Sequence, residues 1–155
     1  MDIKSKIVGQ LNSAEYNPDL HESAPFPIPY FDNKKLRVVF IDAKYQDYLL
    51  GADNVLQTFL KLDRNDRLRD SQMVKHYYDE TLKAGYTKSL GVKGPDDIWN
   101  FVYPSEILID QEENGDFYLV ISGECDWEEE HGLQLVFKAG KKLTKASGHD
   151  GHYTD

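Results

Sequence analysis

The spacing of hydrophobic residues changes along this chain, and that change limits the fold more than any other feature. In residues 45–84 the apolar side chains recur every three or four positions, which is typical of amphipathic helices. In residues 107–138 they alternate or run together in short stretches, which is typical of β-strands. The sequence therefore predicts an α+β domain, with an antiparallel β-sheet that includes a C-terminal hairpin or meander. Two central helices are expected to pack on one face of that sheet.

The helical region divides at a polar break. Residues 45–62 predict the first helix, and the break is expected at Asp63–Asp66. Asp70 or Ser71 can cap the second helix, and Gly85 is expected to end it as a left-handed residue after its last turn.

The β-rich segments carry clear turn signals. Leu36–Ile41 predicts a strand that pairs with Phe26–Phe31, and residues 133–138 predict another. Asn114-Gly115 is typical of a two-residue type I′ turn. With that turn, Glu112 would lie opposite Phe117, Asp110 opposite Leu119, and Leu108 opposite Ile121.

The 155 residues fit one domain, 1–155, with residues 1–24 expected to be weakly ordered because they are rich in turn formers. The 27 Asp and Glu exceed the 18 Lys and Arg, so the net charge is -9, and nucleic-acid binding is disfavoured because phosphates need cations. No apolar run approaches the length of a membrane span. A single cysteine excludes an internal disulfide, and residues 1–11 lack a signal-peptide core, so we expect a cytoplasmic protein.

The negative charge is concentrated in residues 110–130. This segment holds nine acidic residues and no Lys or Arg. Without those nine, 18 acidic residues remain, which match the 18 basic residues of the chain. The sequence therefore predicts an acidic segment on an otherwise balanced body.

The densest group of chemically active side chains lies in residues 125–132, between two predicted strands, where loops often carry function. The candidate residues for an interaction surface, or for a contact that stabilises the fold, are Asp126, Trp127, Glu128, Glu129, Glu130, His131 and His152. In the stabilising hypothesis, Glu130 or His131 hydrogen-bonds the closing turn at Asp150–His152. In the simplest hypothesis, the loop is solvated, while Trp127 packs on the sheet and Cys125 is buried.

Chemical activity of the same loop is an alternative. Metal-ligating groups are present on Cys125, Asp126 and His131, with His149 and His152 nearby in the sequence, but no pair has a diagnostic zinc spacing. His131 with Glu128 or Glu130 offers an acid–base pair, yet the chain lacks a nucleophile elbow, a phosphate loop and an H-E-x-x-H motif. We therefore expect no metal, cofactor or catalytic residue, and the alternative is a metal-dependent or acid–base hydrolase that uses residues 125–131.

The C-terminal part of the chain resembles a group of small bacterial domains of unknown function. The resemblance extends from Trp99 to the C-terminus and rests on Asp126–Leu133, Phe137–Lys141 and Asp150–Thr154, which match D-W-x-x-E-H-G-L, F-K-x-G-K and D-G-H-x-T. Related families are grouped with the immunity proteins of bacterial contact-dependent and polymorphic toxin systems. The resemblance implies a bacterial α+β protein and carries no catalytic role.

Together these features predict a non-enzymatic protein-binding module. An acidic loop would complement a basic surface on another protein and speed their encounter, as an immunity-type inhibitor of a basic toxin requires. A structural or accessory domain is the third hypothesis, after the hydrolase. No nucleic-acid or membrane partner is expected, and the oligomeric state is left open.

Overall fold

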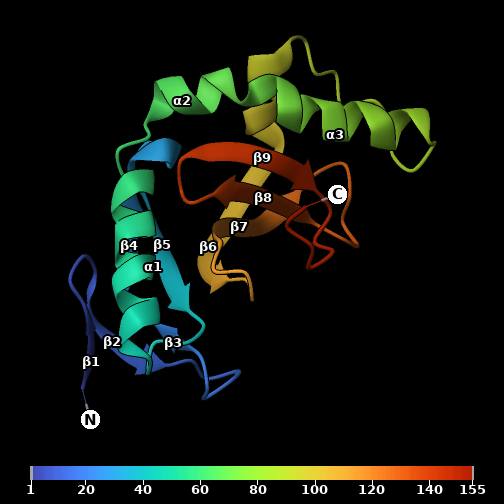
Figure 1. The fold of residues 1–155 in the computed structure, drawn as a ribbon. Coiled ribbons are helices and arrows are strands. Elements are labelled where there is room, and N and C mark those ends of the chain that lie inside the picture. Colours follow the sequence, from blue (N-terminus) through green and yellow to red (C-terminus); the bar gives the residue numbers. More distant parts are fainter. Residues whose placement is uncertain (1, 155) are drawn as a thin grey trace.

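In a computed structural model, residues 2–154 form one open, twisted β-sheet with helices on one face (Figure 1). The strand order is β1-β2-β3-β5-β6-β7-β8-β9, and β4 pairs with β5. The strands are β1 (Ile3–Ser5), β2 (Gly9–Ser13), β3 (His21–Glu22), β4 (Phe26–Ile28), β5 (Lys34–Phe40), β6 (Val102–Gln111), β7 (Phe117–Cys125), β8 (Leu133–Lys138) and β9 (Lys142–Ser147). The predicted α+β class is confirmed.

The sheet is antiparallel except at one pair. β5 and β6 run parallel, with Arg37 beside Glu106 and Val39 beside Leu108. Parallel neighbours need a long crossover connection, and residues 41–101 supply it with all three α-helices. The predicted pairing of Phe26–Phe31 with the following strand is confirmed, because Phe26 lies opposite Leu36.

Three α-helices replace the two that were predicted. They are α1 (Gln46–Phe59), α2 (Arg64–Arg69) and α3 (Ser71–Lys83), and two 3-10 helices are η1 (Pro29–Phe31) and η2 (Pro95–Phe101). The predicted break at Asp63–Asp66 is wrong, because Asp63 caps α2 through a capping box with Asp66. Asp70 joins α2 to α3, and Gly85 follows α3 with φ 80°, as predicted.

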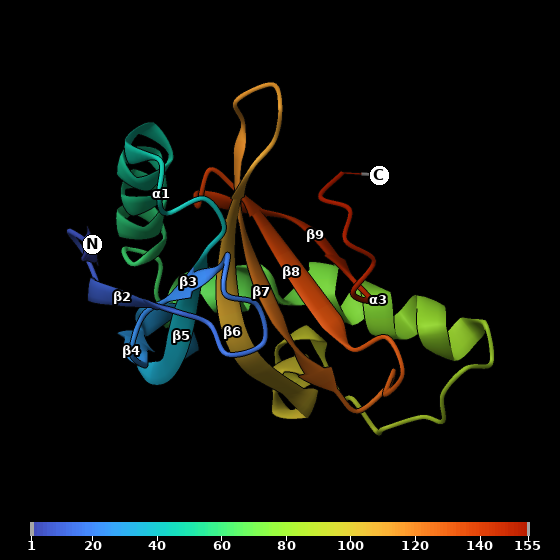
Figure 2. The same ribbon diagram turned by 90° about the horizontal axis from the view of Figure 1, so that it is seen from below.

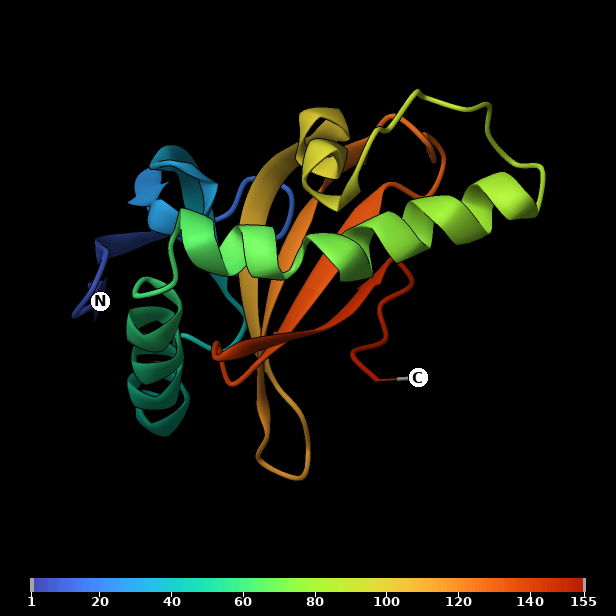
Figure 3. The same ribbon diagram turned by 90° about the horizontal axis from the view of Figure 1, so that it is seen from above.

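The helices cover one face of the sheet, as Figure 3 shows for α2 and α3, while α1 packs against β6 and β7. Alternate strand residues, such as Ile107, Ile121 and Phe137, are fully buried under the helices. The face without helices carries a smaller apolar cluster of Tyr118, Val120 and Val136, with Leu108 and Tyr153 beside it.

The β6–β7 hairpin differs from its predicted geometry. Gly115 has φ 95°, but Asn114 is not left-handed, so the type I′ turn is wrong. The Gly115 N–H bonds the Glu112 carbonyl, and the Glu112 N–H bonds the Asp116 carbonyl, which defines a type I turn followed by a left-handed glycine. That extra loop residue shifts the register by one, so Asp110 lies opposite Tyr118 and Leu108 opposite Val120.

Weak order in residues 1–24 stays a prediction, but the structure gives these residues three short strands. Ser5 and Asp53 are buried, and the Ser5 hydroxyl donates to the Asp53 carboxylate, which ties β1 to α1. No helix of residues 2–154 is both long enough and apolar enough to cross a membrane.

Candidate functional site

The face of the sheet without helices is hollowed where β6 begins and β7 ends. A cleft of about 280 Å³ lies there. Its wall residues are Ser105, Glu106, Ser122, Gly123, Glu124, Glu129, Glu130, His131, Gly132, Leu133 and His149. We call this site the acidic cleft, because four glutamates line it and no Lys or Arg does.

The strand side of the acidic cleft is set by β-strand alternation. Glu106 pairs with Ser122 across β6 and β7, while Ile107 pairs with Ile121 on the buried face. A bulge between Pro104 and Glu106 shifts the pairing register of β6 and β7 just before this point. Glu106 and Ser122 therefore face away from the core side by side.

The loop side of the acidic cleft is residues 126–132. Glu128 organises it, since its Oε1 accepts the Glu130 and His131 backbone N–H groups at 3.2 and 3.3 Å. The same oxygen lies 3.3 Å from His131 Nδ1. The Gly132 N–H closes the turn on the Glu128 carbonyl at 3.0 Å, in a left-handed conformation (φ 62°) that favours glycine.

Trp127 anchors this loop from below. Its indole is almost fully buried, and its ring lies edge-on to Tyr77 and Tyr78 of α3, with centroids at 5.4 and 5.8 Å. Cys125 is buried next to it, as predicted. Burial raises the pKa of the Cys125 thiol to about 11, which keeps it protonated at neutral pH and makes it a poor metal ligand.

The C-terminal segment meets the same loop through the backbone. The His149 N–H donates to the His131 carbonyl at 2.8 Å. The closing turn is held by other residues, because Gln134 Nε2 donates to Asp150 Oδ1 and to the His152 carbonyl. Among residues 2–154, the hydrogen bonds expected from Glu130 or His131 to this turn come instead from the buried Gln134 side chain of β8.

Of the predicted site residues, Glu129, Glu130 and His131 line the acidic cleft, and Glu128 supports it. Trp127 lies beneath it. Asp126 instead accepts a 2.9 Å hydrogen bond from Tyr103, and the exposed His152 lies outside the cleft wall.

Sequence reasoning missed Glu106 and Ser122, and it grouped His149 with His131 only in the metal-site alternative. Glu124 was noted only as part of the acidic run. The alternation around the hairpin could have placed Glu106 and Ser122 on one face, but only with the correct turn type.

The cleft is electrostatically negative. Burial raises the pKa of Glu106, the charge of Glu22 adds to this effect, and His149 opposes it. Concentrated carboxylates in a half-buried site favour a bound cation.

Contacts that the cleft residues already make limit two kinds of chemistry there. Glu128, Glu130 and His131 place ligand atoms within 4.8 Å of one another, but Glu128 Oε1 already holds the loop backbone. Within residues 2–154, the Ser105 and Ser122 hydroxyls make no hydrogen bond to either histidine of the cleft. A hydroxyl nucleophile with an adjacent base is thus not assembled there.

The fold and the cleft define a mixed-sheet α+β domain with a carboxylate-lined cleft on its open sheet face. Residues 7–153 match the family model described as a domain of unknown function, DUF6985, and the chain belongs to this family. The predicted membership of a family of unknown function is confirmed. Comparison with curated proteins and with solved structures finds no match in either set.

Proposed function

We propose that this protein is a non-enzymatic protein-binding module whose acidic cleft accepts a lysine or arginine side chain from a basic partner. The observation that carries this proposal is the composition of the cleft wall, in which Glu106, Glu124, Glu129 and Glu130 converge without a Lys or Arg in the wall. A bound cationic side chain would relieve the repulsion among these carboxylates.

Contacts within the fold also hold the loop wall of the cleft in place before a ligand binds. The loop is fixed at Trp127, at Glu128 and through the Tyr77 hydroxyl, which donates to the Gly132 carbonyl at 2.8 Å. Rigid walls reduce the conformational entropy that is lost on binding. Three glutamates at the rim are exposed and can accelerate association.

The finer proposal is that the partner is a basic toxin and that this protein inhibits it, as an immunity protein does. It rests on the resemblance of the C-terminal motifs and on the complementarity between an acidic cleft and the basic surface of a nucleic-acid-directed toxin. Bacterial origin belongs to the same proposal.

The direct test is an NMR titration of the isotope-labelled protein with short peptides that contain one lysine or one arginine. We expect saturable shifts at Gly123, Gly132 and His149, and none with a neutral peptide of the same length. Glu124→Gln with Glu129→Gln should weaken binding several-fold.

A matched control separates the cleft from total charge. Glu112→Gln with Glu113→Gln at the β6–β7 hairpin tip changes the net charge by the same two units, from -9 to -7. Equal loss of affinity in the two double variants would reject the cleft as the binding site. The toxin proposal is tested separately, by co-expression with a basic toxin encoded beside this gene, where the wild type should restore growth and the cleft variant should not.

A further inference from the structure

A second cavity lies on the helical side of the sheet and shares no wall residue with the acidic cleft. It measures about 180 Å³ and is lined by Phe31, Asp32, Arg67, Trp99, Asn100 and Val102. A cavity of this volume has room for a small group such as a carboxylate.

Arg67 of α2 is the unusual group in this cavity. Its side chain is only 10% exposed, which is rare for arginine. The surrounding fold fixes the guanidinium, because Nη1 donates to the Tyr30 carbonyl at 3.1 Å and to Asp32 Oδ2 at 3.0 Å. The Trp99 ring lies 5.8 Å from the guanidinium carbon.

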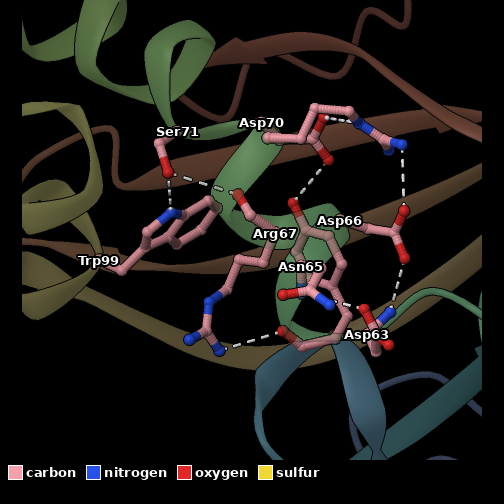
Figure 4. A network of polar contacts seen from close by, with 9 residues as sticks. Asp63, Asn65, Asp66, Arg67, Asp70, Ser71 and Trp99 are labelled. Atoms are coloured by element: carbon pink, nitrogen blue, oxygen red, sulfur yellow. Dashed lines mark hydrogen bonds and ion pairs between the residues drawn. The ribbon is translucent and has the colours of Figure 1, made fainter.

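The position of Trp99 is itself fixed. Its indole N–H donates to the Ser71 hydroxyl at 2.8 Å, and that hydroxyl donates to the Arg67 carbonyl at 3.4 Å (Figure 4). Figure 4 shows the guanidinium below the indole, with Nη1 turned towards its carbonyl acceptor and the opposite edge turned away from it.

That opposite edge lacks an acceptor. Nε of Arg67 is buried, and no atom of residues 2–154 accepts its N–H; the same residues offer no acceptor for the N–H groups of Nη2. A buried donor without an acceptor is costly, so such a group calls for an explanation. Nε and Nη2 present two parallel N–H groups, which is the arrangement that binds a carboxylate with two hydrogen bonds.

We propose that this cavity binds a carboxylate group, which the Nε–Nη2 edge of Arg67 holds beside Trp99. The charge of the site favours a monoanion, because a single guanidinium already faces Asp32 and a dianionic phosphate would be repelled more strongly. The carboxylate comes either from a free small acid or from the C-terminus of a polypeptide, and the two sources share this chemistry.

The Nε–H resonance of Arg67 reports on the site directly. The chain has four arginines, so Arg37, Arg64 and Arg69 serve as internal controls in the same spectrum. We expect the Arg67 Nε–H to shift in a saturable way with acetate and to remain in place with chloride at the same ionic strength. The absence of a saturable shift, or an equal shift with chloride, overturns the proposal.

Asp32→Asn supplies the decisive variant, because it should strengthen binding. Asp32 is left-handed (φ 55°), a conformation that asparagine tolerates, and the asparagine oxygen can still accept from Nη1. Removal of the nearby negative charge should tighten acetate binding on the order of tenfold. Unchanged or weaker binding in Asp32→Asn contradicts a carboxylate site.

The source of the carboxylate is distinguished by comparing acetate with N-acetylglycine, which mimics a polypeptide C-terminus. Tighter binding of N-acetylglycine supports a peptide carboxylate, and equal binding supports a small acid. Arg67→Lys should abolish both, since an ammonium group cannot donate two parallel hydrogen bonds. If Arg67→Lys does not fold, the wild-type resonance and Asp32→Asn still decide.

Discussion

The hydroxyl of Tyr77, on α3, donates a 2.8 Å hydrogen bond to the carbonyl of Gly132, at the end of the loop that walls the acidic cleft. The thiol of Cys125 lies 3.6 Å from the same carbonyl oxygen. A helix on the covered face of the sheet thus fixes the main chain of the acidic cleft on the open face. Substitutions in α3 should therefore alter the geometry of the cleft, although the substituted residues do not touch a ligand bound there.

Tyr77→Phe tests this connection. Loss of the hydroxyl should lower the free energy of unfolding by about 0.5–1.5 kcal/mol and weaken the binding of a lysine peptide. Tyr78→Phe is the matched control, because the Tyr78 hydroxyl accepts the Leu90 N–H and both rings pack on Trp127. Urea unfolding should show similar costs for the two variants. Equal effects on peptide affinity would refute a specific role for Tyr77.

The hairpin geometry predicts a backbone effect at Gly115. A Cβ added there meets no atom within 4 Å, so Gly115→Ala acts only through the left-handed conformation. We expect a loss of about 1–2 kcal/mol in the free energy of unfolding. Gly94→Ala is the control, because Gly94 is extended (φ -155°) and equally open. If both variants unfold at the same urea concentration, the left-handed turn is incorrect.

The register of this hairpin shows where sequence reasoning succeeded and where it failed. Alternation and β-branched residues located the strands, because burial on a pleated sheet imposes those patterns. Asn114-Gly115 located the turn but left its type open, since a left-handed glycine also suits a three-residue loop. The error of one residue placed Asp110 and Leu108 of β6 opposite the wrong residues of β7 in the prediction.

The candidate site could be predicted only in part from the sequence, for a related reason. Residues 128–131 are adjacent in the chain and were found together. Glu106 and His149 reach the same cleft through strand pairing and through the C-terminal segment, which local spacing does not encode. The buried Gln134 gave no signal, because a glutamine in a strand is normally read as an exposed residue.

Gln134 should contribute more to stability than the histidine of the loop. Its side chain is fully buried and ties β8 to the closing turn at two acceptors, whereas the His131 side chain is largely exposed. Gln134→Ala should cost about 1–3 kcal/mol. His131→Ala should change the free energy of unfolding by less than about 0.5 kcal/mol. The reverse order in thermal unfolding would restore His131 as the stabilising contact.

Asp150 makes the stability that the closing turn contributes depend on pH. Burial opposes ionisation, but hydrogen bonds from Lys145, the His152 N–H and Gln134 outweigh it and lower the pKa of Asp150 to about 2. The ionised form is therefore favoured in the folded state. Its stabilising effect is present above pH 4 and is lost as the pH falls towards 2.

Asp150→Asn should thus destabilise the protein at pH 6, and its difference from wild type should shrink in urea titrations repeated down to pH 2. Because Asp150 is largely exposed, solvent screening keeps the effect small. A difference that stays constant with pH would show that the carboxylate charge contributes nothing.

Metal content separates the binding module from the hydrolase alternative. The ligand geometry predicts no stoichiometric metal in protein purified without a metal-affinity tag, because Glu128 is engaged by the loop backbone and Cys125 stays protonated. Elemental analysis by mass spectrometry measures this directly. One equivalent of zinc that disappears in His131→Ala would favour the hydrolase.

The nine acidic residues of segment 110–130 occupy two places in the structure. β7 carries the acidic β6–β7 hairpin tip at one end, which projects from the body in Figure 2, and the acidic cleft at the other. Glu124 of the cleft lies eight positions after Asp116 of the hairpin tip, which is about 26 Å along an extended strand, or roughly three Debye lengths at physiological salt. A small cationic partner in the cell would therefore respond to only one of these groups at a time. In dilute buffer both fields would overlap, and association rates measured there would overstate the contribution of the cleft.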